Sequence, residues 1–345
     1  MVAVTPEIVR DIYRGVLGRE PENDTIVEEH AAAGLPLSEM LRQVVSCDEF
    51  LARFRQRRGE GDLLYDGLNP GDEDILRRHL DPGAPHPEFV TTFVGTRMRT
   101  TLAAGAQTMG GACYRDIPTV VGDIAAETVE YVGTIKALEA GVGPFVMAEL
   151  GAGLGSWSVI GGHLARKMGR GPIRLYAVEA SAGRVENLKI NFADNGFDPA
   201  DHTVEAAIVG PQDGYALFPL IDVLGDWGAS ALFVDTKEER HGYETVRSIS
   251  LPTLLKGEAQ VDLLHFDIQG AEADVVAASI DMLNAKVRYM VIGTHGRDIE
   301  HSLLTTLRAA GWALENEQLA RFDRTGGQES IRVDGTQVWR NPNIS

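Results

Sequence analysis

Cysteine, basic residues and long apolar runs are all scarce in this sequence. Its two cysteines, Cys47 and Cys113, cannot build a disulfide framework or, by themselves, a zinc site. No apolar run reaches the length of about 18 residues that a membrane-spanning helix needs, and the first residues lack the basic and then apolar pattern of a signal peptide. We therefore expect a cytoplasmic protein that does not bind a membrane.

The charge balance is strongly acidic. Lys and Arg number 32 against 50 Asp and Glu, so the formal net charge is −18. Such a chain repels phosphate, which argues against a nucleic-acid partner, and attracts cationic ligands over long range. A solvated acidic surface is the simpler alternative. The length of 345 residues and the hydrophobic content of 44% suit one large α/β domain with a small appendage.

A glycine-rich turn, Glu149–Gly155, stands between an apolar run at 145–148 and a helix-like segment at 156–168. A strand, a glycine turn and a helix in this order form a nucleotide-type cofactor site. The glycines occupy positions 151, 153 and 155, whereas a dinucleotide-binding turn has its third glycine one position later, where Ser156 stands here. The spacing disfavours a pyrophosphate; a purely structural turn is the alternative.

The acid at the start of this turn indicates a positively charged cofactor. The Glu149 carboxylate would repel a phosphate but attract an ammonium or a sulfonium, and S-adenosylmethionine (SAM) carries both. The next strand-like run ends at Glu179, which can accept hydrogen bonds from both ribose hydroxyls or, alternatively, cap the following helix. A third run, 203–209, contains Ala206 and Ala207, whose small side chains leave room for adenine.

Two more strand-like runs end in polar residues. The fourth run carries Asp267 and Gln269 near its end, and the fifth, 287–293, is followed by His295. Because open α/β sheets bind ligands at the carboxyl ends of their strands, these side chains are candidates for the reaction centre. His265 shares a strand face with Asp267, and we expect His265 to be structural.

Residues 1–64 are predicted to form a separate helical module. Apolar residues recur there at helical spacing, and glycines separate the first helices. Four helices are expected, near 5–18, 24–33, 38–45 and 48–58. The module resembles the small helical repeat called DUF4214, mainly through Val16–Pro21 and Ser46–Phe50. That resemblance implies no chemistry, and docking to pathway enzymes is our hypothesis for it.

The rest of the chain is predicted to be an α/β domain with a covering segment before it. Residues 65–140 are irregular and then helical, and can form a lid, which makes Tyr114 and Glu130 candidate site residues. Residues 141–345 alternate strand and helix and end in β-rich segments around a turn at Asp334–Gly335. We therefore expect a Rossmann-like fold, a mostly parallel seven-stranded sheet closed by an antiparallel hairpin.

Residues 111–340 resemble the FkbM family of SAM-dependent methyltransferases. The motifs that carry the likeness are Glu149–Gly153, Val178–Ala180, Asp262–Glu272 and Gly293–His295. The resemblance implies methyl transfer from SAM to sugars, polyketides and other secondary metabolites, mostly on oxygen. Together with the strand ends above, it indicates a cofactor held by Glu149, Gly151, Ala152, Gly153, Glu179, Ala180, Ala207 and Asp267. Gln269 stands where the family usually has a glutamate, so an acid or base role is not carried over to that position.

The segment 209–250 is the longest connection of the domain and is rich in acids and aromatic rings. Carboxylates bind ammonium groups through charge-assisted hydrogen bonds, and aromatic faces suit cations and sugar rings; a solvated loop is the alternative. We therefore expect an amino-sugar substrate, because length, helical module and acidity also resemble the aminoglycoside N-methyltransferases of gentamicin-type pathways. The candidate substrate contacts are Trp227, Asp235, Glu238, Glu239, His295 and Tyr114.

Methylation of an amine requires its lone pair, so the amine must first shed a proton. His295 could accept that proton near neutral pH while Asp267 and Gln269 orient the amine; a structural histidine is the alternative. Metal-dependent O-methylation needs clustered oxygen ligands, so no metal is expected. The competing functions are O-methylation of a glycoside or polyketide hydroxyl, a non-catalytic scaffold and an NAD oxidoreductase. Whether the chain forms a homodimer is left open.

Overall fold

The computed structural model describes residues 4–14, 20–21, 23–37, 40, 44, 67–118, 127–323 and 330–344. The chain divides into two compact units, Met1–Tyr65 and Asp66–Ser345. In the part of the chain that the structure describes, every helix is too short or too polar to cross a membrane.

The described part of the smaller unit contains helices α1 (Pro6–Ile12) and α2 (Asp24–Ala32). The side chains of Thr5 and Asn23 cap these helices by accepting hydrogen bonds from backbone N–H groups of the first turn. Apolar residues from both helices share a small core. The third and fourth expected helices lie largely outside the described residues.

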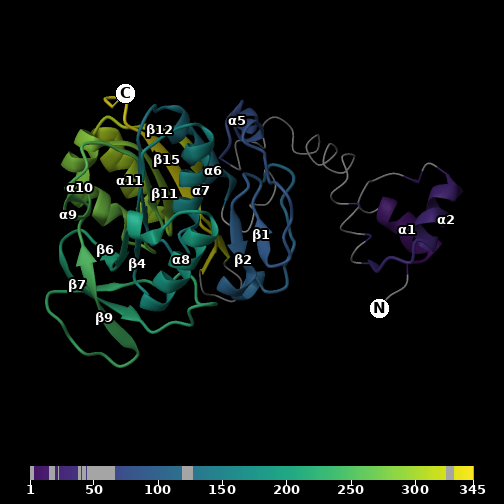
Figure 1. Ribbon diagram of the computed structural model, residues 1–345, viewed down its shortest axis with the longest axis horizontal. Helices are drawn as coiled ribbons and strands as arrows, with labels where there is room; N and C mark the ends of the chain where they lie inside the picture. The colour runs from purple at the N-terminus through teal and green to yellow at the C-terminus, as the bar shows by residue number, and fades with distance from the viewer. Residues whose placement is uncertain are drawn as a thin grey trace. The chain divides into compact units, whose positions relative to one another are not determined.

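The larger unit is built on a seven-stranded sheet with the order β12-β15-β11-β10-β3-β4-β5 (Figure 1). Its parallel strands are β3 (Phe145–Leu150), β4 (Ile173–Glu179), β5 (Thr203–Ala206), β10 (Val261–Phe266) and β11 (Val287–Thr294). Strands β3, β10 and β11 are buried along their whole length, and this is why their sequences are nearly continuous apolar runs. The predicted Rossmann-like α/β fold is confirmed.

Two antiparallel strands close the sheet, β12 (Ala313–Gln318) and β15 (Gly335–Arg340). The expectation of a hairpin turn at Asp334–Gly335 is wrong. The strand before that joint, β14 (Ser330–Val333), pairs with β13 (Arg321–Asp323), whereas β15 pairs with β11 and β12. The two strands also differ in burial. Strand β15 is almost wholly buried and joins the main sheet, whereas β14 is mostly exposed.

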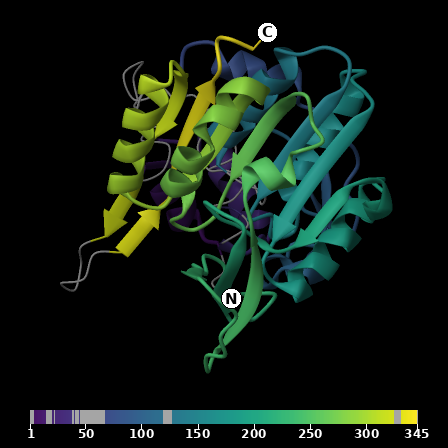
Figure 2. The ribbon, with the colours of Figure 1, turned by 90° about the vertical axis from the view of Figure 1, so that its left-hand side faces the viewer.

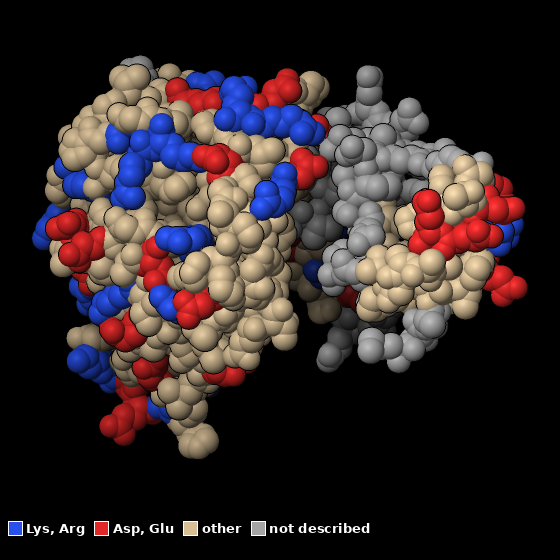
Figure 3. Space-filling view, turned by 45° about the vertical axis from the view of Figure 1, so that its right-hand side comes forward, with Lys and Arg blue, Asp and Glu red and all other residues tan. Residues whose placement is uncertain are grey.

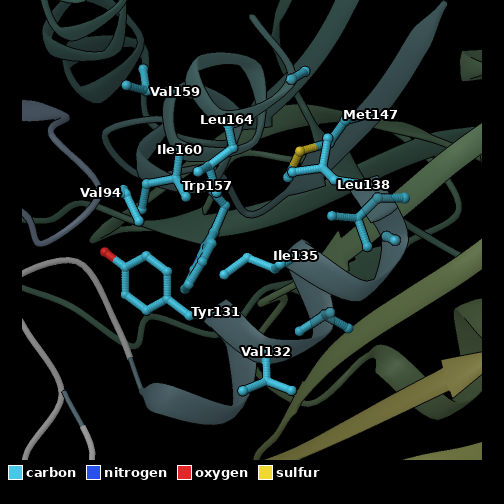
Figure 4. Close-up of a cluster of buried hydrophobic side chains, with 14 of the residues drawn as sticks. Val94, Tyr131, Val132, Ile135, Leu138, Met147, Trp157, Val159, Ile160 and Leu164 are labelled. Carbon is cyan, nitrogen blue, oxygen red and sulfur yellow. The ribbon is translucent and has the colours of Figure 1, made fainter. Parts of the chain in front are cut away.

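Helices cover both faces of the sheet (Figure 2). One face carries α6 (Thr128–Glu139), α7 (Ser156–Lys167) and α8 (Ala182–Asp194). The other carries α9 (Leu251–Leu254), α10 (Glu272–Lys286) and α11 (Arg297–Ala309). On the first face, Trp157 packs among Tyr131, Ile135 and Leu164, all buried (Figure 4). These two cores hold the carboxyl ends of the parallel strands rigidly in place.

The long connection is not a bare loop. It contains β6 (Ile208–Val209), β7 (Gly214–Pro219), β8 (Leu232–Val234) and β9 (Tyr243–Ile249). These strands form a second sheet in the order β6-β9-β7-β8, which projects from one end of the domain (Figures 1 and 2). Four of its five Phe, Tyr and Trp residues lie in these strands, and the fifth, Trp227, lies between β7 and β8.

The segment before the domain packs on the glycine-rich turn. It contains α5 (Asp72–Arg78), β1 (Phe89–Thr91), β2 (Arg97–Arg99) and the short helices η3 (Thr100–Leu102) and η4 (Ala104–Ala106). Its apolar residues Met98, Leu102 and Ala106 share a cluster with Leu154 of the turn. The segment thus forms one wall of the region that the turn borders.

Candidate active site

A cavity of about 700 Å³ opens at the carboxyl ends of β3, β4 and β10. This volume lies within the range of roughly 300–1,000 Å³ that small-molecule sites occupy. Strands β3 and β10 are neighbours, but the chain continues from β3 towards β4 and from β10 towards β11. The two connections therefore diverge and leave a crevice, as at the ligand sites of other open α/β sheets.

The glycine-rich turn forms the floor of this cavity. Gly151, Gly153 and Gly155 have φ angles of +76°, +54° and +69°, which favour glycine because a Cβ is strained there. At Gly151 there is also no space, because a Cβ would lie 1.8 Å from the carbonyl oxygen of Asp267. The turn therefore brings bare backbone to the cavity and lets the end of β10 pass directly beside it.

Glu149 holds the helix that follows the turn. Its Oε1 accepts a hydrogen bond from Trp157 N at 3.0 Å and its Oε2 one from Ser158 N at 2.7 Å. These are two of the unpaired N–H groups at the start of α7, where a carboxylate is favoured. Burial raises the pKa of Glu149 despite these bonds. Glu149 lines the cavity, and its hydrogen-bonding oxygens shape the turn.

Glu179 ties the turn to the start of α8. Its Oε2 accepts from Gly153 N at 2.9 Å and its Oε1 accepts from Ser181 N at 2.8 Å. Ser181, rather than Glu179, is the N-cap of α8. Because a carboxylate oxygen has two lone pairs, each oxygen of Glu179 can still accept a hydroxyl. Its position on the cavity wall therefore suits the ribose of a nucleoside.

The cavity wall beyond Glu179 is apolar and comes from the second sheet and the residues before it. Ala207 is fully buried, and Phe218 and Phe233 contribute rings to the same lining. Small and aromatic side chains in this order leave a flat slot of the kind that a purine ring fills.

The opposite end of the cavity is polar and centres on Asp267. Its side chain is 48% exposed, and its Oδ1 accepts a hydrogen bond from Gln269 Nε2 at 2.7 Å. Loss of water around it tends to raise the pKa of Asp267, but His295, 3.3 Å away, outweighs this effect and lowers the pKa. Asp267 is therefore a carboxylate at neutral pH and faces the cavity.

His295 does not line the cavity, and its environment disfavours a general base. Its Nε2 lies 3.3 Å from Asp267 Oδ1 and its Nδ1 lies 2.8 Å from Glu272 Oε1. Burial tends to lower the pKa of His295, but the two carboxylates raise it to about 10. An imidazole already protonated at neutral pH cannot take a proton from an amine. The role expected for His295 therefore needs revision.

His265 lies on the cavity wall, at the end formed by Glu149. Its ring stacks on Trp157 with 5.0 Å between centroids, and its Nε2 lies 3.0 Å from Glu130 Oε1. Burial tends to lower the pKa of His265, but the charges of Glu130 and Glu149 raise it. His265 is held by its packing as the sequence led us to expect, yet it also belongs to the site.

Ten of the residues indicated by the sequence are brought together on the cavity wall. They are Glu149, Gly151, Ala152, Gly153, Glu179, Ala180, Ala207, Trp227, Asp267 and Gln269. Six others are not, His295 and Glu130 among them. Tyr114 does not line the cavity but packs against two apolar clusters beside it, and Asp235, Glu238 and Glu239 are exposed in the β8–β9 connection. These three acids stay in water because the second sheet carries them outward from the cavity mouth.

Sequence reasoning missed two charged residues of the wall, Arg184 and Asp274. The Arg184 guanidinium lies 4.2 Å from the ring centroid of Trp227, and its Nε donates to Val223 O at 3.3 Å. Its partners are about forty residues away in sequence, so no local spacing could have revealed it. Asp274 comes just after the Asp262–Glu272 motif, in the first turn of α10. Acids are common in the first turn of a helix, so its position did not mark it as a site residue.

Acidic side chains outnumber basic ones on the cavity wall. Acidic and basic side chains are interspersed over the face of the larger unit in Figure 3. The charged residues of the cavity wall are the four acids Glu149, Glu179, Asp267 and Asp274, the base Arg184 and the titratable His265. The cavity therefore favours a ligand with positive charge.

Comparison with known proteins identifies the class. The family model for the methyltransferase FkbM domain matches residues 149–311. A protein of Jannaschia sp. (strain CCS1), whose name describes it provisionally as a methyltransferase, is 30% identical over 265 residues, which are 75% of this chain and 94% of that protein. The chain therefore belongs to the FkbM family of methyltransferases, and the predicted enzyme class is confirmed.

Solved structures with related folds are more distant. A precorrin-6y C5,15-methyltransferase from Geobacter metallireducens GS-15 has a TM-score of 0.37 at 13% identity and covers 63% of this chain and 89% of its own. Methyltransferase FkbM from Methylobacillus flagellatus KT has a TM-score of 0.34 at 11% identity and covers 63% of this chain and 55% of its own. Both TM-scores are too low to support an argument about this site.

The residues present fit SAM, the methyl donor that the family implies. The glycine turn brings bare backbone to the cavity wall, Glu179 offers lone pairs to a ribose, and the lining near Ala207 is small and apolar. The carboxylates on the wall suit an ammonium and a sulfonium. Among the residues that the structure describes, no group of three or more His, Cys, Asp or Glu is arranged to hold a metal ion.

Proposed function

We propose that this enzyme transfers a methyl group from SAM to an amine of a small molecule, in particular an amino-sugar of the aminoglycoside type. The observation that carries the proposal is Asp267, an ionised carboxylate that is half exposed at the polar end of the cavity. A carboxylate in such a place binds a protonated amine strongly through charge-assisted hydrogen bonds. Asp274 adds a second acid to the same cavity.

The orientation of the cofactor follows from the two ends of the cavity. SAM supplies a methyl group on a sulfonium, which makes that carbon an electrophile. Ala207 would receive the adenine, Glu179 the ribose and the turn at Gly151 the amino-acid part. The methyl group would then face Asp267. Holding an amine in line with that carbon can contribute about 7–11 kcal/mol to the lowering of the barrier.

The chain's own residues would manage the charge on the amine. An amine attacks only through its lone pair, so the bound ammonium would first lose one proton. The C–N bond would then form as the S–C bond breaks, and the nitrogen would become positively charged again. Asp267 stabilises that positive charge and hydrogen-bonds the amine, while Gln269 holds Asp267 Oδ1. The proton lost before the attack would leave to water, because His295 is already protonated and the pKa of Asp267 is lowered.

A substrate panel tests this proposal. The purified protein would be incubated with SAM and either kanamycin-type aminoglycosides or neutral glycosides, and products would be identified by mass spectrometry. We expect methylated amines and a kcat/KM about 10- to 160-fold lower in Asp267→Asn, since hydrogen bonds to charged groups contribute about 1.5–3 kcal/mol each. Absence of turnover with every amine would remove the N-methylation proposal.

O-methylation of a glycoside or polyketide hydroxyl is the second candidate. It is supported by the same Asp267, because a carboxylate beside a hydroxyl can accept its proton during attack. Most acids of the connection lie outside the cavity, which leaves fewer contacts for a polycation than the sequence suggested. Turnover of neutral glycosides but not of amines in the panel would favour this candidate.

For residues 1–64 we propose docking to partner enzymes. Helices α1 and α2 share a core within a compact unit distinct from the catalytic one. A chain that starts at Asp66 should therefore methylate free substrate at an unchanged rate. Loss of soluble, folded protein on this truncation, measured by circular dichroism, would contradict the proposal.

A further inference from the structure

Glu272, at the start of α10, organises the turn that follows β10. Its side chain is fully buried, and its Oε1 accepts from Ile268 N at 3.2 Å. Its Oε2 accepts from Gly270 N at 3.1 Å. Oε1 also lies 2.8 Å from His295 Nδ1. One buried carboxylate thus holds both the backbone around Asp267 and the histidine behind it.

His295 connects this carboxylate to the reaction centre. It follows β11, whereas Asp267 and Glu272 flank the turn after β10. The histidine side chain is 10% exposed, with Nδ1 at Glu272 and Nε2 at Asp267 Oδ1. Both ring nitrogens face carboxylate oxygens, so both act as donors only when the ring is an imidazolium.

The turn between the two acids is strained, which shows that its shape is imposed. Gln269 has a φ angle of +54°, a left-handed conformation that side chains other than glycine rarely adopt. In this conformation Gln269 Nε2 donates to Asp267 Oδ1, and the Ser230 hydroxyl donates to Gln269 O at 2.9 Å. The donors from Gln269 and His295 thus converge on Oδ1, and Oδ2 is left for the acceptor.

We infer that Glu272, His295 and Asp267 form a positioning triad, in which Glu272 holds His295 as a fixed cation and His295 aims Asp267 at the acceptor. Glu272 and His295 are positioning residues, and Asp267 alone contacts the acceptor. That Asp267 faces an amine rests on the proposed function. The ion pair between Glu272 and His295 does not depend on it.

The surroundings of His295 support a permanent charge. The groups that face it are Asp267 at the end of β10, Glu272 on α10 and Asp334 between β14 and β15, all acidic. Glu130 on α6 pairs with His265 on β10. The charge of His265 in turn helps to lower the pKa of Asp267. Burial tends to lower the pKa of His295, but Asp267 and Glu272, which hold its two ring nitrogens, raise it to about 10.

The first test reads the charge of His295 without any substrate. Two-dimensional NMR of ¹⁵N-histidine-labelled protein would follow the ring nitrogens from pH 6 to 9, with His295→Asn to assign the signal. We expect both nitrogens of His295 to stay protonated throughout this range in the native chain and to begin losing a proton within it in Glu272→Gln. Glu258→Gln is the matched control, because Glu258 is also a buried glutamate and pairs with Arg174, and it lies before β10, at the other end of that strand from Asp267.

The second test reads the effect on Asp267. Loss of the fixed cation should raise the pKa of Asp267, so the acid limb of the kcat profile should move to higher pH in Glu272→Gln and in His295→Asn. Affinity for S-adenosylhomocysteine, by calorimetry, should change less than about threefold, and Glu258→Gln should keep the native profile.

The two tests separate the triad from the proposed function. A His295 that titrates near pH 6.5 in the native protein, or does not respond to Glu272→Gln, overturns the triad even if amines are methylated. If His295 is charged but the protein methylates only hydroxyls, the triad is supported and the N-methylation proposal is wrong. An unshifted acid limb in both variants would reduce Glu272 and His295 to structural residues.

Discussion

The Arg184 guanidinium lies over the ring of Trp227, 4.2 Å from the ring centroid, at the mouth of the cavity. Arg184 also donates to the carbonyl of Val223, so the chain that carries Trp227 is held on both its backbone and its ring. A Cβ at Gly153 would lie 3.2 Å from the same ring. Trp227 therefore reaches from the connection between β7 and β8 to the glycine-rich turn and lines the cavity between them.

Trp227 should report cofactor binding by fluorescence. It is 51% exposed, whereas Trp157, Trp312 and Trp339 are 5%, 4% and 0% exposed, so acrylamide should quench Trp227 preferentially. S-adenosylhomocysteine should shield it and reduce quenching. In Trp227→Phe this reduction should disappear, while calorimetry shows weaker but measurable binding. Unchanged quenching on binding in the native protein would place the ring away from the cofactor.

Gly151→Ala should abolish cofactor binding and destabilise the fold. A left-handed alanine costs about 1–2 kcal/mol, and overpacking against the Asp267 carbonyl adds about 1–3 kcal/mol. Gly143→Ala is the matched control: Gly143 has a similar φ of +73°, but no atom lies within 4 Å of a Cβ there. In urea unfolding, Gly143→Ala should lose only the free energy that a left-handed alanine costs, without the overpacking contribution. Equal destabilisation by the two variants would contradict the close approach at Gly151.

Glu179→Gln should weaken S-adenosylhomocysteine binding about 10- to 100-fold by calorimetry. Both carboxylate oxygens accept backbone N–H groups, so an amide must turn its NH₂ against one donor, and the turn at Gly153 loses a partner. Glu186→Gln on the exposed face of α8 provides the control. If Glu179→Gln binds as well as the control, the ribose assignment is wrong.

His295 should make stability depend on alkaline pH. Its pKa is about 10 in the folded protein and about 6.5 when unfolded, so its contribution is complete below pH 6.5 and is lost as pH rises towards 10. The maximum contribution is about 5 kcal/mol, from 1.36 kcal/mol per pH unit. Urea unfolding at pH 6.5 and 9.5 should show a larger loss in the native chain than in His295→Asn. Parallel losses would argue against the raised pKa.

Local patterns were sufficient for the sheet and for many residues of the cavity wall. Burial on both faces forces parallel strands to be continuous apolar runs, and those runs located β3, β10 and β11. The spacing of Gly151, Gly153 and Gly155 marked the turn, because positive φ angles need glycine. What these patterns left out was the direction of each side chain at a strand end, as His295 illustrates.

The sequence by itself determined an acidic α/β chain, its glycine turn and a set of polar strand ends that meet at one edge. Only the tertiary structure decided that His295 stands behind Asp267, that Arg184 braces Trp227, and that the acids near residue 238 remain outside. The reason is the distance along the chain over which each effect acts. Backbone conformation and burial leave a local imprint on composition, whereas the charge state and aim of a side chain depend on neighbours that folding brings from distant parts of the chain.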